Sequence, residues 1–233
     1  MTIQRKALLL VGSPREKSTS EILGTYLLNK LREKGIETEK VRIYPSMEAD
    51  KGYEYLLSSV DRSDILILSF PLYVDSLPSL VTKALEMIWE HRRSLDNPNK
   101  QQFVAISNNG FPEAHQNDTA LEICHHFAIE TGMEWAGSLG VGGGEAIGFM
   151  SKLLREKSLK KLGFISRNER KSLDSIAEFL SNSAIIPAEV TDLRTNRPMP
   201  KWLYVLVGTL FVWRREAKRN KVWDRIYDRP YQN

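Results

Sequence analysis

Three short runs of uninterrupted apolar residues constrain the fold more than any other feature of the chain. They occupy residues 7–11, 65–68 and 103–106, and none of them shows a helical or an alternating period. Such a run is typical of a strand buried on both faces, as in a parallel sheet. Residues 36–43 and 133–141 are also predicted to be strands, and segments with helical spacing lie between the strands. The alternation predicts a doubly wound α/β fold, with a five-stranded parallel sheet covered by helices on both sides.

Three turns rich in polar residues follow buried strands, at residues 12–20, 71–78 and 107–112. Ligands of such sheets bind at the carboxyl ends of the strands, where the strand order reverses. In the strand order 2-1-3-4-5, the first, third and fourth strands are neighbours, so their turns are expected to meet. The sequence therefore predicts one binding site that is built from these three turns.

The first turn connects a buried strand to a helix and is rich in hydroxyl groups. A helix start leaves backbone N–H groups unpaired and carries a partial positive charge, which suits it to hold a phosphate. A plain helix cap is the alternative, but a cap needs one hydroxyl and this turn offers four with an arginine, so we favour the phosphate site. The turn matches neither a Walker loop nor the dinucleotide fingerprint. Its candidate ligands are Ser13, Arg15, Ser18, Thr19 and Ser20.

The second and third turns contribute aromatic rings, amides and a glycine. A phosphate site, planar apolar walls and amide hydrogen bonds together describe a mononucleotide with a flat polar ring, and flavin mononucleotide (FMN) fits this description. For Tyr73 the alternative is a half-buried loop ring, and for one of the two asparagines it is ordinary turn chemistry. The glycines at 142–144 are expected to form a flexible strand exit. The candidate residues of these two turns are Pro71, Leu72, Tyr73, Ser76, Ser107, Asn108, Asn109 and Gly110.

The alternation of strands and helices stops after Gly144. Helices are predicted over 145–162 and around 173–180, and residues 194–200 are expected to be a linker. An apolar run follows at residues 202–213, which is too short to span a bilayer because a spanning helix needs about 20 residues. We therefore expect an α/β domain over residues 1–183 and a basic, aromatic, helical C-terminal extension over residues 184–233.

The charge of the chain is unevenly distributed. The net charge is +4, but residues 194–233 hold ten Lys or Arg against three Asp or Glu, so the rest of the chain carries −3. This is not the pattern of a nucleic-acid binder, whose basic residues form a face on the fold.

The single cysteine, Cys124, and the adjacent His125 and His126 offer no metal-ligand spacing, so no metal is expected. No signal peptide precedes the first strand, and a cytoplasmic location is expected.

The first two turns make the sequence resemble the NAD(P)H-dependent FMN reductase branch of the flavodoxin-like superfamily. That family typically has G-S-P-R-x-G-S-x-S/T in its first turn and P-x-Y-x-x-S-x-P in its second. Lys17 replaces one glycine of this pattern, and Asp75 and Ser79 stand where the family often has glycine. The resemblance covers about residues 5–180 and leaves the extension unexplained. The matching residues are Gly12, Ser13, Pro14, Arg15, Ser18, Ser20, Pro71, Tyr73, Ser76 and Pro78.

The resemblance implies a noncovalently bound FMN, with its phosphate in the first turn and its ring between the other two. It implies an oxidoreductase that passes hydride from NAD(P)H through FMN to a quinone or another small acceptor. The cofactor performs this chemistry, so no side chain is assigned as a catalytic acid or base. The alternative is a flavodoxin-type electron carrier without NAD(P)H reductase activity of its own. Such carriers are smaller and strongly acidic, which argues against this alternative.

Two expectations concern partners. The family often builds the open face of the flavin at a subunit boundary, so a homodimer is expected. The apolar run of the extension, with its basic flanks, has the chemistry to lie on an anionic membrane surface. Packing of this run on the body or on a partner subunit is favoured instead, because apolar surface of this size is rarely left exposed.

Overall fold

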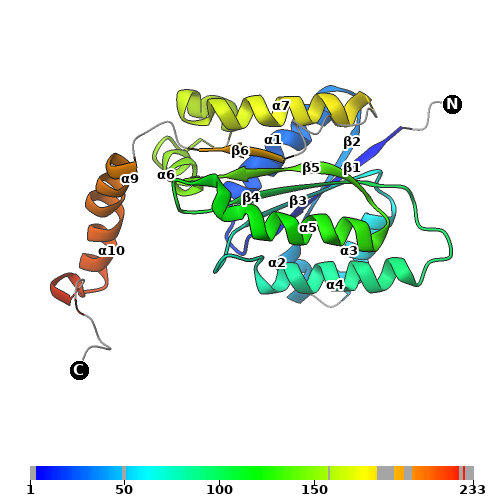
Figure 1. The fold of residues 1–233 in the computed structure, drawn as a ribbon, viewed down its shortest axis with the longest axis horizontal. Helices are drawn as coiled ribbons and strands as arrows, with labels where there is room; N and C mark the ends of the chain where they lie inside the picture. Colours follow the sequence, from blue (N-terminus) through cyan, green and yellow to red (C-terminus); the bar gives the residue numbers. More distant parts are fainter. Residues whose placement is uncertain are drawn as a thin grey trace. The chain divides into compact units, whose positions relative to one another are not determined.

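The computed structural model describes residues 4–48, 51–156, 158–182, 192–196, 201–225 and 228. Contacts divide the chain into two compact units, residues 1–197 and residues 198–233. The first unit contains a parallel sheet with helices on both faces, as predicted from the apolar runs (Figure 1).

The sheet has six parallel strands in the order β2-β1-β3-β4-β5-β6. The order of the first five strands agrees with the prediction, but the predicted number of five is wrong. The sixth strand pairs with the end of β5 and lies in the segment that was expected to be extension and linker. Its sequence, Asp-Leu-Arg-Thr, lacks an apolar run because an edge strand is buried less than a central one. The strands are β1 (Lys6–Val11), β2 (Glu37–Arg42), β3 (Ile65–Pro71), β4 (Gln102–Asn108), β5 (Glu134–Val141) and β6 (Asp192–Thr195).

Helices cover both faces of the sheet and form two hydrophobic cores (Figure 1). Leu9 of β1 packs in one core, while Leu8 and Leu10 pack in the other, because successive side chains of a strand point to opposite faces. This explains why the central strands are apolar without a period. One face is covered by α1 (Thr19–Glu33), α6 (Gly144–Leu153) and α7 (Arg167–Asn182). The other is covered by α2 (Ile43–Glu48), α3 (Gly52–Asp61), α4 (Ser79–Arg93) and α5 (Asp118–Thr131).

One detail of the helices differs from the sequence predictions. The helix predicted over 145–162 is divided, because α6 ends at Leu153 and Arg155 has a φ of 51°, which a helix cannot continue through. A 3₁₀-helix, η2 (Leu159–Ser166), follows. Asp118 begins α5 and does not cap it, and its carboxylate accepts a hydrogen bond of 2.6 Å from Arg194 of β6.

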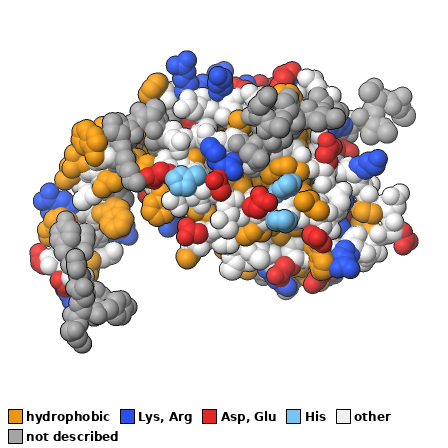
Figure 2. Space-filling view, in the orientation of Figure 1, with side chains coloured by type: hydrophobic (Ala, Val, Ile, Leu, Met, Phe, Trp, Pro, Cys, Tyr) orange, Lys and Arg blue, Asp and Glu red, His pale blue; other side chains and the backbone are white. Residues whose placement is uncertain are grey.

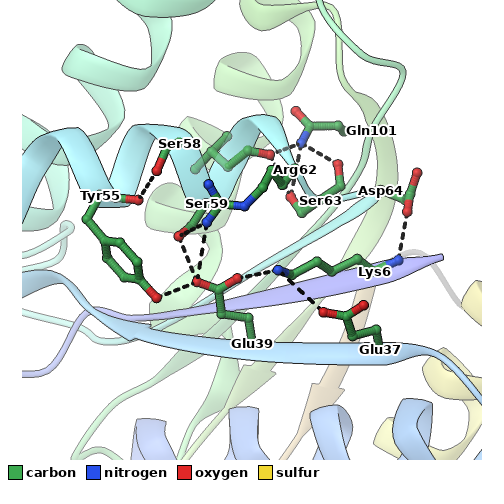
Figure 3. A network of polar contacts seen from close by, with 11 residues as sticks. Lys6, Glu37, Glu39, Tyr55, Ser58, Ser59, Arg62, Ser63, Asp64 and Gln101 are labelled. Atoms are coloured by element: carbon green, nitrogen blue, oxygen red, sulfur yellow. Dashed lines mark hydrogen bonds and ion pairs between the residues drawn. The ribbon is translucent and has the colours of Figure 1, made fainter. Parts of the chain in front are cut away.

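A polar network joins β1, β2 and α3 near the amino-terminal ends of the strands (Figure 3). Lys6 Nζ lies 2.6 Å from a carboxylate oxygen of Glu39, and Tyr55 and Ser59 donate hydrogen bonds of 2.8 and 2.7 Å to the other oxygen. Burial alone would raise the pKa of Glu39, but the hydrogen bonds from Lys6, Ser59 and Tyr55 outweigh it and lower this pKa to about 2. The network therefore holds an ionised carboxylate near the amino-terminal ends of the strands, at the end of the sheet opposite the predicted turns.

Candidate functional site

The three predicted turns lie together at the carboxyl ends of β1, β3 and β4, which are adjacent strands. The N–H of Gly12 donates a hydrogen bond of 2.8 Å to the carbonyl of Ser69, which ties the first turn to β3. The N–H of Leu72 donates one of 2.8 Å to the carbonyl of Asn108, which ties the second turn to the third. The sheet thus brings segments about 100 residues apart into one site.

The first turn begins α1 with a side-chain cap. Ser18 is the N-cap residue, and its hydroxyl oxygen accepts a hydrogen bond of 3.2 Å from the N–H of Glu21. The Glu21 carboxylate in turn accepts a hydrogen bond of 2.9 Å from the N–H of Lys17. Lys17 has a φ of 54°, a left-handed conformation that glycine adopts most easily, at a position where the resembling family has glycine. The turn therefore has a backbone conformation typical of glycine, although this position is occupied by lysine.

Two hydroxyls of the first turn donate hydrogen bonds to neighbouring segments. Thr19 Oγ1 donates to the carbonyl oxygen of Gly144 at 2.9 Å, and Ser20 Oγ donates to Oδ1 of Asn108 at 2.7 Å. Ser20 is 1% exposed, so its bond to Asn108 is a buried link between the first and third turns. The sequence predicts these two hydroxyls as phosphate donors, and this remains a prediction; in this structure they link the first turn to neighbouring segments. The backbone N–H groups of Thr19 and Ser20 remain available to bind an anion.

Backbone N–H groups at the start of α1 form the anion-binding feature of the site. Among the described residues, no acceptor is found for the N–H groups of Glu16, Ser18, Thr19 and Ser20. The Ser18 hydroxyl accepts a hydrogen bond and keeps its own hydrogen available as a donor. Arg15 is exposed beside them. A helix start with free N–H groups binds phosphate through these donors and through the helix dipole.

Glu16 of the first turn and Glu21 of α1 are neutralised by basic partners on β2. Arg42 lies 3.0 Å from the carboxylate of Glu16, and Lys40 lies 2.7 Å from the carboxylate of Glu21. Burial would raise the pKa of Glu21, but hydrogen bonds from Lys40 and from a backbone N–H lower it, so this carboxylate is ionised at neutral pH. Together with Arg15, these four side chains carry one net positive charge, which is compatible with a bound anion.

The second turn is a tight reversal with an exposed tip. The N–H of Tyr73 donates to the carbonyl of Ser76 at 2.9 Å, and the N–H of Ser76 donates back at 3.1 Å. The two residues between them, Val74 and Asp75, have φ values of 49° and 57°. A positive φ at a β-branched residue is rare and costs about 1–3 kcal/mol, so it is typical of functional sites. The reversal leaves the Tyr73 ring 42% exposed at the rim of the site.

The third turn contains a polar side-chain atom for which the described part of the chain offers no partner. The hydroxyl of Ser107 donates to Oδ1 of Asn117 at 2.8 Å, so Ser107 has a structural partner. Asn109 is 4% exposed, and its Nδ2 donates to the carbonyl of Glu113 at 3.1 Å. Its Oδ1 is buried and has no hydrogen-bond partner among the described residues. A buried acceptor without a donor costs about 1–3 kcal/mol, and a ligand N–H would remove this cost.

Glycines after β5 form a part of the site that sequence reasoning missed. A Cβ on Gly142 would lie 2.4 Å from the carbonyl oxygen of Pro112, and one on Gly144 would lie 3.0 Å from an asparagine side chain of the third turn. The glycines were expected to form a flexible exit, but they pack tightly against the third turn. Glu145 follows them, with its carboxyl carbon 3.4 Å from the position of a Cβ on Gly110. The run of three glycines was the available signal, because only glycine permits such close backbone approach.

A sequence comparison agrees with this architecture. The model of the flavodoxin-like fold family (Flavodoxin_2) matches residues 5–156, which is more than half of the chain. The chain belongs to the flavodoxin-like fold family. This flavodoxin-like chain has the fold predicted from its apolar runs, with β6 and residues 198–233 in addition. No curated protein matches the sequence.

Solved structures share the fold at low sequence identity. The rubredoxin oxygen:oxidoreductase of the anaerobe Desulfovibrio gigas gives a TM-score of 0.54 at 12% identity, over 77% of this chain and 36% of its own. A flavone reductase gives 0.53 at 13% identity, over 76% of this chain and 64% of its own. A Streptococcus pneumoniae flavodoxin gives 0.51 at 16% identity, over 77% of this chain and 99% of its own. Identities this low establish the fold alone.

Proposed function

We propose that the three turns bind FMN and that this flavodoxin-like protein is an oxidoreductase. It passes hydride from NAD(P)H through the bound FMN to a quinone or another small acceptor. One observation carries the proposal. At the start of α1 are N–H groups for which the described residues offer no acceptor, and the buried Ser20–Asn108 hydrogen bond joins them to a turn whose buried oxygen has no donor among those residues. The first feature suits a phosphate dianion, and the second suits an N–H donor on a flat polar ring.

Each turn has its own role in this proposal. The N–H groups of Glu16, Ser18, Thr19 and Ser20 bind the phosphate together with the Ser18 hydroxyl, and Arg15 screens its charge. Tyr73 provides a flat wall for the ring, and Oδ1 of Asn109 accepts a hydrogen bond from it. Bound FMN would supply the hydride transfer between the nicotinamide and the acceptor. The protein binds and orients the reactants, so no side chain has to move a proton.

We also propose that a second copy of the chain covers part of the rim. Tyr73, Val74 and Phe111 are 42%, 99% and 57% exposed around the turns. Apolar groups gathered at a rim suit a subunit contact that leaves one face of the flavin open to a nicotinamide. Sedimentation velocity of the FMN-loaded protein at micromolar concentration should show a dimer, and a monomer would contradict this part of the proposal.

The test of the site begins with the flavin. The purified protein should be yellow, and mass spectrometry should identify the released chromophore as FMN. The protein stripped of flavin is then titrated with FMN and with riboflavin, which lacks the phosphate. Two or more charge-assisted hydrogen bonds of about 1.5–3 kcal/mol each should make FMN bind at least about 100-fold more tightly. Equal affinity for the two flavins, or no binding at micromolar concentration, would refute the phosphate site.

Steady-state kinetics separate an enzyme from an electron carrier. NADPH and NADH oxidation is followed with the FMN-loaded protein and a soluble quinone. A reductase turns over many times, whereas a flavodoxin-type carrier shows almost no NAD(P)H oxidation of its own. Flavin binding without turnover would keep the site and reject the reductase activity.

A further inference from the structure

The second unit exposes an apolar helix face that the flavin site does not explain. In it, α9 (Lys201–Val207), the π-helical segment η3 (Gly208–Trp213) and α10 (Arg214–Arg219) follow one another directly. Hydrophobic side chains gather along this stretch (Figure 2). Five of them, called the tail face here, are 45–66% exposed: Trp202, Val205, Leu206, Leu210 and Trp213. Their spacing of three, one, four and three residues places them along one side of a helix.

Basic residues follow the tail face. Residues 201–225 hold seven Lys or Arg against two Asp or Glu, and no acidic residue precedes Glu216 in this range. Arg219 pairs with Glu216 at 2.8 Å, and Arg214 lies over the ring of Trp223 at 5.1 Å from its centroid. Within the described residues, no ion pair is found for the cations Arg215, Lys218 and Lys221. The stretch thus combines exposed apolar side chains with cations for which no anionic partner is found among the residues that the structure describes.

The length of the apolar run decides whether this stretch can span a membrane or can only lie on its surface. No helix among the described residues is long and apolar enough to cross a bilayer. The uncharged run from Trp202 to Trp213 has 12 residues, against the roughly 20 that a spanning helix needs. Tryptophan stands at both ends of the run, and this residue prefers the headgroup region of a bilayer. A helix of this kind suits a position in the plane of the interface.

We propose that the tail face lies in the headgroup region of an anionic lipid bilayer, with the following cations on the lipid phosphates. Charge favours this occupant over a second tail, because two tails side by side would bring together segments that each carry a net charge of +5 over residues 201–225. An anionic bilayer offers both an apolar layer for the tryptophans and negative charge for Arg215, Lys218 and Lys221. The proposal is independent of the flavin site and stands or falls without it.

The test is co-sedimentation of the full chain with vesicles. Vesicles of phosphatidylcholine with about one third phosphatidylglycerol should bind the protein, and pure phosphatidylcholine vesicles should bind it at least about tenfold more weakly. Arg215→Gln with Lys218→Gln should weaken binding about 30-fold, from about 1 kcal/mol per charge. Trp202→Ser with Trp213→Ser should weaken it by about tenfold or more, since the apolar anchors are removed.

Matched controls come from the first unit. Arg167→Gln with Lys171→Gln removes two exposed cations of α7, and Phe164→Ser removes an aromatic side chain that is 68% exposed. Both controls should bind anionic vesicles like the unchanged chain. Equal binding by the tail variants, or equal binding to neutral and anionic vesicles, overturns the proposal. Loss of a dimer in the tail variants, without any vesicle binding by the unchanged chain, would assign the tail face to a second copy and also overturn it.

Discussion

Replacing Ser18 by aspartate should separate the two roles of this residue, which caps α1 and is proposed to bind the FMN phosphate. Aspartate is as good an N-cap as serine, because its carboxylate accepts the same N–H hydrogen bond, here from Glu21. Its negative charge also interacts favourably with the helix dipole, by about 0.3–1 kcal/mol, although the nearby Glu16 and Glu21 reduce this gain. The free energy of unfolding of the flavin-free protein should therefore stay within about 1 kcal/mol of the original.

The same change should strongly weaken FMN binding. A carboxylate about 4 Å from a unit negative charge is repelled by about 1 kcal/mol in water and about 4 kcal/mol at an effective dielectric constant of 20. Ser18 is half-buried, and the phosphate carries nearly two charges, so a loss of about 2–4 kcal/mol is expected. This corresponds to an affinity that is about 30- to 700-fold lower. Stability and affinity should thus respond differently to a single substitution.

The assay is a fluorescence titration of the flavin-free protein with FMN and riboflavin, beside urea unfolding. Ser18→Asn is the matched control, since asparagine caps equally well and has the same size without the charge. Riboflavin affinity should be nearly equal in the aspartate and asparagine variants, because riboflavin has no phosphate to repel. An unchanged FMN affinity in Ser18→Asp would show that the phosphate does not lie at the start of α1.

Three further outcomes are expected from the structure. Ser20→Ala should lower the free energy of unfolding by about 1–3 kcal/mol, since it leaves Oδ1 of Asn108 buried without its donor. In urea unfolding, Asn108→Ala should then lower the free energy of unfolding by less in the Ser20→Ala variant than in the original chain. Lys17→Gly should keep the stability or raise it by up to about 1 kcal/mol, whereas Lys17→Val should lower it by about 1–3 kcal/mol; equal melting temperatures for the two variants would contradict the left-handed backbone. Glu39→Gln should lower the free energy of unfolding by about 2–3 kcal/mol at pH 7. The pKa of Glu39 is about 2 in the folded protein, against 4.5 normally, so the difference between the two proteins in urea unfolding should shrink as the pH falls from 4.5 to 2. A difference that stays constant over this range would refute the ion pair.

The central strands could be predicted from the sequence because their burial on both faces leaves a direct trace. Leu8, Leu9 and Leu10 pack in alternate cores, so the run has to be apolar throughout. Strand β6 leaves no such trace, since its polar residues pair with only one neighbour and it follows β5 after a long excursion. A pattern-based prediction recognises burial, and an edge strand of four residues shows little of it.

The position of the site could be predicted from the strand order, but its internal contacts could not. The hydroxyls of Thr19 and Ser20 bond to Gly144 and Asn108, which are 125 and 88 residues away in the sequence. Spacing within one turn gives no information on such distant partners. The Asn109 oxygen, which has no partner among the described residues, could not be predicted from the sequence either, because its burial depends on the third turn as a whole.

The late arrival of β6 has a consequence for how the protein is made. Asp192 is the 51st residue after Val141, so at about 5–20 residues per second a ribosome needs about 3–10 s to synthesise the chain between them. A nascent chain that folds β5 before β6 is synthesised would expose the hydrogen-bonding groups of residues 138–141, which pair with β6 in the folded protein. Translation pauses over this interval would prolong the exposure of an open strand to other nascent chains. Synonymous codon choice between residues 142 and 191 would then influence the yield of folded protein without changing a single side chain.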